Sequence, residues 1–127
     1  MILAIDIGNT NIVVGCFDKD NVLFVERVST ESTKTELEYA VSLKNVLEIY
    51  GIHPKEVEGG IISSVVPPLT NVLKASAEKI INGKVLVVGP GIKTGLNLLM
   101  DNPASVGSDL VVDAVAAIHE YLSLIHI

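Results

Sequence analysis

The stretch MILAIDIGNTNIVV, residues 1–14, joins two apolar runs through a short polar link. The first run delivers Asp6, and a glycine with three short polar side chains follows before the second run begins. Two apolar strands joined by so short a connection pair as an antiparallel hairpin. The sequence therefore predicts a strand over residues 2–6, a tight turn centred on Gly8, and a strand over residues 11–17.

This turn has two interpretations. In the first it holds a phosphate group, because Gly8 lets the backbone approach a bulky anion and residues 9–11 add amide and hydroxyl donors to the N–H groups of the turn. A bare carboxylate repels phosphate, so Asp6 would act through a hydrated Mg²⁺, which binds carboxylates together with water and phosphate oxygens. In the second, the stretch is an ordinary Gly-Asn hairpin turn capped by Asp6.

Composition excludes several classes of function. The chain has 127 residues and a net charge of −6, and it contains no block of Lys or Arg, so the charge pattern of a nucleic-acid-binding or membrane-surface protein is missing. Its mean hydropathy of +0.51 is high, which fits either buried parallel strands or an apolar face that packs on another domain or subunit. No run approaches the roughly 18 apolar residues of a membrane span, and no basic leader precedes the first strand. We therefore expect a cytoplasmic protein.

Cysteine and histidine usage gives no sign of a disulfide or a metal site. Cys16 is the only cysteine, and it lies inside an expected strand, where it would be a small buried apolar residue. The histidines share no metal-ligand spacing with one another or with Cys16. They are His53, His119 and His126.

The order of the remaining elements predicts the fold class. Residues 21–28 complete an antiparallel meander, and Thr35 with Glu38 forms a possible capping box for a helix that stops at Gly51. We expect that helix to bury an apolar stripe made of Leu37, Val41, Leu43, Val46, Leu47 and Tyr50. The later expected elements are a strand at 61–66, a helix at 67–81, a strand at 84–88, a loop at 92–102 and a helix whose stripe runs from Val106 to Ile118. A meander followed by α-β-α-β-α is an α/β arrangement, that of a ribonuclease-H-like or actin-like ATPase half.

A second segment whose residues could take part in binding or catalysis is DNPASVGSDL, residues 101–110. Asn102 before Pro103 is a good helix start, and Gly107 permits a close approach of the backbone. Asp109 then lies near the start of an apolar helix, where the helix dipole favours a carboxylate by about 0.3–1 kcal/mol. That is a sufficient structural reason for this residue. The alternative is that Asp109 is a general base that accepts the proton of a substrate hydroxyl facing the phosphates.

Four segments in this order and spacing resemble type III pantothenate kinase: residues 4–11 (AIDIGNTN), 62–67 (ISSVVP), 92–97 (IKTGLN) and 101–109 (DNPASVGSD). The resemblance runs from residue 1 to about Tyr121. It implies membership of the superfamily of acetate and sugar kinases, Hsp70 and actin. The implied reaction is the ATP-dependent phosphorylation of pantothenate, the first step of coenzyme A biosynthesis.

The resemblance also implies roles for individual residues. Asp109 would be the catalytic base, and Asp6 would hold Mg²⁺. The expected ligands are Mg·ATP, pantothenate or a related small hydroxy acid, and a monovalent cation, K⁺ or NH₄⁺; a homodimer is expected too. The ATP phosphates would be bound by Asp6, Ile7, Gly8, Asn9, Thr10, Asn11, Ile12 and Val13, and pantothenate would be contacted by Gly107, Ser108, Asp109 and Leu110.

Two positions depart from the pattern of the family. Leu110 stands where the family has an Arg that would clamp a substrate carboxylate, and Met100 stands where it tends to have Tyr. Losing one charge-assisted hydrogen bond costs on the order of 1.5–3 kcal/mol. The alternative function is therefore a non-catalytic, nucleotide-binding or regulatory homologue of the same fold.

Length is a third departure, because the family's fold consists of two ribonuclease-H-like halves that close over the nucleotide. We expect residues 1–121 to be the N-terminal half and residues 122–127 to be an atypical tail at a truncation point. The adenosine pocket and most of the cation site would then belong to the other half. On this interpretation the chain alone is expected to be inactive.

Overall fold

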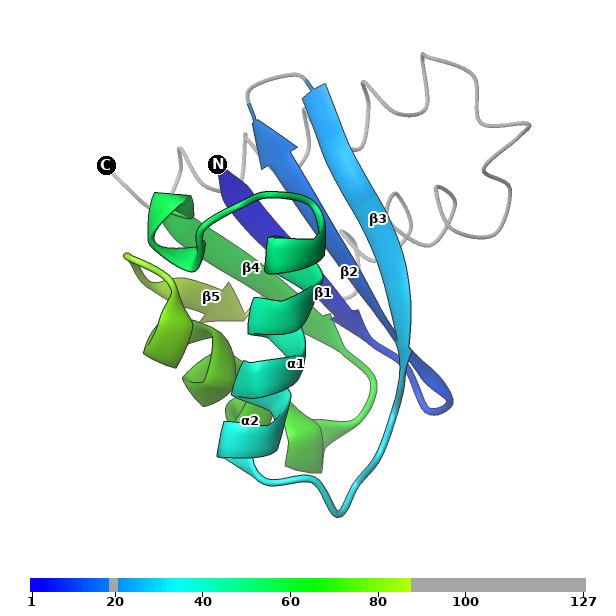
Figure 1. The fold of residues 1–127 in the computed structure, drawn as a ribbon. Helices are drawn as coiled ribbons and strands as arrows, with labels where there is room; N and C mark the ends of the chain where they lie inside the picture. The colour runs from blue at the N-terminus through cyan, green and yellow to red at the C-terminus, as the bar shows by residue number, and fades with distance from the viewer. Residues whose placement is uncertain (19–20, 88–127) are drawn as a thin grey trace, which may run out of the picture.

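The computed structural model describes residues 1–18 and 21–87, which form one five-stranded sheet with two helices (Figure 1). The sheet order is β3-β2-β1-β4-β5; β1, β2 and β3 pair in antiparallel fashion, and β4 and β5 are added in parallel. The elements are β1 (Ile2–Ile7), β2 (Asn11–Asp18), β3 (Asn21–Ser29), α1 (Glu36–Ile49), the short 3₁₀ helix η1 (Pro54–Glu56), β4 (Gly59–Ser64), α2 (Pro67–Ile80) and β5 (Val85–Val87). The predicted meander and the helix-connected parallel strands are confirmed. The loop and helix expected after residue 91 lie outside the described residues.

Strand β1 is central, and all six of its residues are buried. Side chains alternate along a strand, so its two faces have different neighbours. Leu3, Ile5 and Ile7 join the core cluster with residues of α1 and α2, and both helices cover this same face of the sheet (Figure 1). Ala4 and Asp6 therefore lie on the opposite face, where they are also buried.

Helix α1 begins and ends where the sequence predicts. The Thr35 hydroxyl accepts a hydrogen bond from the Glu38 N–H (3.3 Å), and the Glu38 carboxylate accepts one from the Thr35 N–H (3.1 Å), which completes the capping box. Gly51 follows the helix with a φ of +73°, in the left-handed region that favours glycine.

The expected apolar stripe of α1 is partly wrong. Leu37, Val41 and Tyr50 are 64%, 48% and 43% exposed, whereas Tyr39 and Ala40 are buried. Tyr39, Leu43 and Leu47 follow at intervals of four residues and share one face, as helix geometry requires. Apolar residues occur on both sides of α1, so the pattern alone did not identify the buried side.

Strand β4 begins and ends two residues earlier than predicted. At its start, Gly60 packs tightly, since a Cβ there would lie 3.1 Å from a Val85 side-chain carbon and 3.2 Å from the Leu3 carbonyl oxygen. At its end, the Ser64 hydroxyl accepts a hydrogen bond from the Val66 N–H (3.0 Å), a local turn that competes with strand pairing. Helix α2 then starts at Pro67 as predicted, with Leu69 and Leu73 buried and Val72 and Ile80 packed against the core.

The connections between the strands place different helices at two opposite edges of the sheet. We call the edge at which β1 and β4 end the carboxyl edge; α1 and α2 both begin there (Figure 1). We call the opposite edge, at which β1 and β4 begin and where η1 lies, the amino edge. No helix within the described ranges is long and apolar enough to cross a membrane.

Candidate phosphate-binding site

The turn between β1 and β2 is closed by its own backbone. The Gly8 N–H donates to the Asn11 carbonyl (2.9 Å), which leaves Asn9 and Thr10 exposed at the tip. A Cβ on Gly8 would lie 3.0 Å from the Asn11 carbonyl oxygen, closer than side chains normally approach backbone. A larger residue at this position would force the Asn11 carbonyl to move by a few tenths of an ångström, so glycine favours the closure of the hairpin itself, a reason that does not depend on any ligand.

The polar side chains of the turn are available to a ligand. Asn9, Thr10 and Asn11 form no side-chain hydrogen bond within the part of the chain that the structure describes. Ile7 and Ile12, in contrast, are 0% exposed and belong to the core. Of the residues expected to bind phosphates, these isoleucines can offer only their backbone, and the polar residues can offer side chains as well.

Asp6 lies at the carboxyl edge next to a second polar residue. In the sheet register it is paired with Val13 of β2 and with Ser63 of β4. Paired residues of neighbouring strands present their side chains on the same face. Asp6 is 3% exposed and Ser63 is 4% exposed, so a carboxylate and a hydroxyl are buried side by side where two parallel strands end.

Ser63 is a candidate site residue to which the sequence analysis gave no role. Its hydroxyl oxygen is buried and has no hydrogen-bond partner within the described ranges. Buried polar groups normally have partners, and a bound water or ion is one explanation of an exception. A hydrated Mg²⁺ takes oxygen ligands and keeps several of its waters, so the donor set of Asp6 and Ser63 fits this ion. The signal in the sequence was a polar residue that follows the apolar run of an expected strand.

The other predicted site residues cannot be placed. Gly107, Ser108, Asp109 and Leu110, together with Met100, lie outside the described residues. No group of three or more His, Cys, Asp or Glu side chains that could hold a metal occurs within the described ranges. Cys16 is 0% exposed, as predicted, and burial raises the pKa of its thiol to about 11, so it is not a reactive nucleophile.

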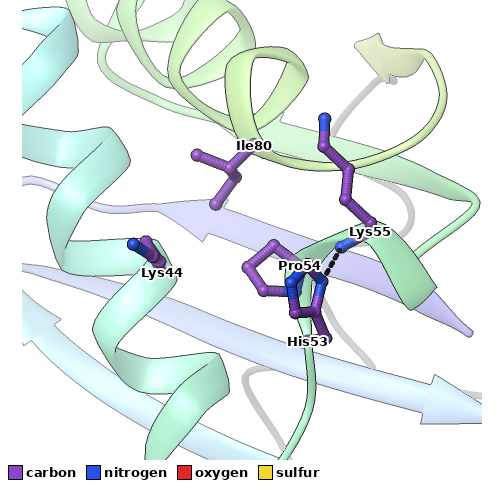
Figure 2. Close-up of a pocket in the computed structure, with 5 residues that line it drawn as sticks. All are labelled: Lys44, His53, Pro54, Lys55 and Ile80. Atoms are coloured by element: carbon purple, nitrogen blue, oxygen red, sulfur yellow. Dashed lines mark hydrogen bonds between the residues drawn. The ribbon is translucent and has the colours of Figure 1, made fainter.

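A pocket of about 260 Å³ lies at the amino edge and is distinct from this site (Figure 2). Its two lysine side chains interact with other groups of the chain. The Lys44 ammonium is 3.7 Å from the Glu48 carboxylate, and the Lys55 ammonium donates to the Ile81 carbonyl (3.5 Å). Both lysines of this pocket therefore already have a partner within the chain. The residues that line it are Lys44, His53, Pro54, Lys55 and Ile80.

The sheet order and the placement of the helices define a ribonuclease-H-like α/β domain. RuvC from Thermus thermophilus, solved in complex with a Holliday junction substrate, matches with a TM-score of 0.55 over 95% of this chain and 94% of that chain, at 14% identity. The ROK hexokinase from the same organism matches with a TM-score of 0.55 over 84% of this chain and 38% of that chain, at 15% identity. At these identities the likeness shows the fold alone, and it confirms the predicted fold class.

Sequence relatives identify the family within this fold. The family model described as type III pantothenate kinase matches residues 2–127, and the chain belongs to this family. A type III pantothenate kinase of Brevibacillus brevis is 49% identical over 121 residues, and one of Exiguobacterium sp. is 46% identical over 121 residues. Each match covers 95% of this chain and 48% of the relative. The chain thus spans about half the length of the curated relatives it matches.

Proposed function

We propose that this chain supplies the phosphate-binding half of an ATP-dependent pantothenate kinase, the enzyme of the first step of coenzyme A biosynthesis. The single observation that carries the proposal is the arrangement of polar groups at the carboxyl edge. There, a backbone-closed turn presents polar side chains that form no hydrogen bond with the described residues, and it lies beside the buried pair of Asp6 and Ser63. We infer the reaction from the family of the chain, since its relatives are named as pantothenate kinases.

Different residues at the carboxyl edge would bind the phosphates and the Mg²⁺ of Mg·ATP. The backbone N–H groups of the turn and the side chains of Asn9 and Thr10 would donate to the phosphate oxygens. Asp6 and Ser63 would hold the hydrated Mg²⁺ through their oxygens. When bound, Mg²⁺ neutralises charge on the phosphate groups. Because the turn is closed by its own hydrogen bond, little ordering remains to be done when the phosphates bind.

The remaining roles follow from the family resemblance. Asp109 would accept the proton of the pantothenate hydroxyl, and residues 107–110 would contact pantothenate. A second ribonuclease-H-like half would supply the adenosine pocket and most of a site for K⁺ or NH₄⁺. The complete enzyme would be a cytoplasmic homodimer.

The test is a fusion of residues 1–121 to the second half of the Brevibacillus brevis relative, assayed for pantothenate-dependent ADP formation. Activity is expected, and Asp109→Asn should lower kcat by a factor on the order of a hundred or more, since general-base catalysis contributes roughly 10²–10⁴-fold. Asp113→Asn, four residues further along the chain, is the matched control and should leave kcat unchanged. Equal rates for Asp109→Asn and the unaltered fusion would remove Asp109 from the mechanism. Turnover by the unfused chain would refute the need for a second half.

A second candidate function is a nucleotide-binding homologue without pantothenate kinase activity, which Leu110 and Met100 favour. Calorimetry that finds ATP binding by the fusion but neither pantothenate binding nor turnover would support it. The variant Leu110→Arg separates the two candidates. A gain of pantothenate affinity in this variant would show that the rest of the pocket is intact.

A further inference from the structure

We infer that Thr30 is a positioning residue: it fixes the peptide groups of the turn from Gly8 to Asn11 for phosphate binding, and Tyr39 anchors it from α1. This inference rests on the proposed function of the turn. It concerns residues that lie well away from the turn in sequence and that the family resemblance did not single out.

Thr30 bonds to the turn at two points. Its side-chain hydroxyl donates to the Gly8 carbonyl (2.8 Å), and its backbone N–H donates to the Thr10 carbonyl (2.9 Å). The second bond extends the pairing of β2 with β3. The first reaches past the start of β2, which lies between β3 and β1 in the sheet, to the residue that follows β1. The Thr30 hydroxyl therefore ties the end of β1 to the end of a strand with which β1 does not pair.

The bond to the Gly8 carbonyl decides which way the turn presents its donors. The Gly8 carbonyl and the Asn9 N–H belong to one planar trans peptide group, so they point in opposite directions. With the oxygen held by Thr30, the Asn9 N–H points away from Thr30, and it has no partner in the part of the chain described. A free carbonyl turned toward a phosphate would repel it, whereas an N–H group attracts it. Thr30 thus keeps the oxygen away from the anion.

Tyr39 holds Thr30 in place through the neighbouring residue. The Tyr39 hydroxyl accepts a hydrogen bond from the Glu31 N–H (2.9 Å) and donates one to the Glu31 carbonyl (2.7 Å). Tyr39 is 1% exposed, so the core fixes its ring, and the Lys34 ammonium lies 5.5 Å from the ring centroid. A largely exposed connection between β3 and α1 is thereby clamped next to Thr30.

The test compares four variants of the chain with the unaltered chain by NMR, following backbone amide shifts during titration with Mg·ATP and, separately, with magnesium tripolyphosphate. Thr30→Val keeps the shape of the side chain and removes the hydroxyl, and Thr30→Ser keeps the hydroxyl. Thr70→Val is the matched control, because Thr70 is also half-buried and donates to a backbone carbonyl, that of Val66 (3.4 Å).

We expect Thr30→Val to weaken binding roughly three- to tenfold, the effect of one hydrogen bond, while Thr30→Ser and Thr70→Val bind as the unaltered chain does. A merely structural role would lower the urea midpoint of Thr30→Val and Thr70→Val alike and leave the affinity unchanged. Tyr39→Phe should also weaken binding, and an unchanged affinity in this variant would remove Tyr39 from the arrangement.

The two ways of failing are distinguishable. If the amides of residues 8–11 respond to both probes with equal affinity in Thr30→Val and the unaltered chain, the inference about Thr30 is overturned and the proposed function stands. If those amides do not respond in the unaltered chain, the proposed role of the turn is itself overturned.

Discussion

The two edges of the sheet use their polar groups in opposite ways. At the amino edge, the Met1 ammonium lies 3.6 Å from the Glu58 carboxylate, and the Glu58 N–H donates to the Met1 carbonyl (3.0 Å). At the carboxyl edge, hydrogen bonds hold the backbone of the turn, while the side chains of Asn9 and Thr10 remain exposed and unbonded within the described ranges. One edge is closed by its own interactions and serves stability. The other fixes its backbone and, among the described residues, leaves polar side chains exposed, which is the arrangement on which the proposed phosphate binding rests.

The largest expected effect is at the amino edge. In Gly83→Ala the new Cβ would lie 1.9 Å from the Glu58 carbonyl oxygen, and backbone atoms cannot move aside as a flexible side chain can. We expect the free energy of unfolding, measured with urea, to fall by about 3 kcal/mol. Gly59→Ala is the control, since its Cβ would meet only the Lys84 carbonyl at an ordinary 3.6 Å. Equal losses in the two variants would show that the amino edge is not tightly closed.

The second prediction concerns Cys16, which is paired with Leu3 toward the amino edge. Burial raises the pKa of its thiol from 9.0 to about 11, so between these values the unfolded chain loses a proton that the folded chain keeps. Stability should therefore fall as the pH rises from about 9 to about 11, by at most roughly 1 kcal/mol per pH unit. Urea midpoints measured across this range should show the loss in the unaltered chain and a smaller slope in Cys16→Ala. Parallel curves would contradict the burial of the thiol.

The third prediction tests the carboxyl edge directly. Asp6→Asn keeps the size of the side chain and removes its charge, so the affinity for Mg·ATP should fall by roughly ten- to a hundredfold, the effect of one charged contact. The control is Asp18→Asn, which makes the same change at the end of β2, at the amino edge. NMR titration of both variants would sharpen the comparison. The same affinity in both would erase the difference between the edges.

The smallest effect is expected from Thr35→Ala, at the start of α1. Losing the capping hydroxyl should lower the free energy of unfolding, measured with urea, by about 1 kcal/mol and leave Mg·ATP affinity unchanged, because Thr35 holds the helix and not the turn. The hydrogen bond from the Thr35 backbone N–H lowers the pKa of the Glu38 carboxyl, so this support is present above the usual Glu range and lost as the pH falls through the lowered pKa. Ser42→Ala, which removes a bond to the Glu38 carbonyl within the helix, is the control. A changed nucleotide affinity in Thr35→Ala would mean that the helix start, too, shapes the site.

Patterns between near neighbours predicted much of this fold. The antiparallel meander, the capping box of Thr35 and Glu38, the glycine stop at Gly51 and the burial of Cys16 are all confirmed. The buried side of α1 was not predicted correctly, because apolar residues lie on both of its sides and only the contact with the sheet and α2 selects Tyr39 over Leu37. The proposed roles of Asp6 and Asp109 remain predictions.

What the sequence by itself determined is the order of the elements, the tight turn at Gly8 and the family. Each depends on residues close together in the chain or on motifs in a fixed order. Only the tertiary structure decided that Ser63 lies beside Asp6 and that Thr30 bonds to a carbonyl 22 residues away. It also decided that Tyr39 bonds to the connection between β3 and α1. These contacts depend on strand register and helix packing, which are set by the burial of the whole core and not by any local pattern.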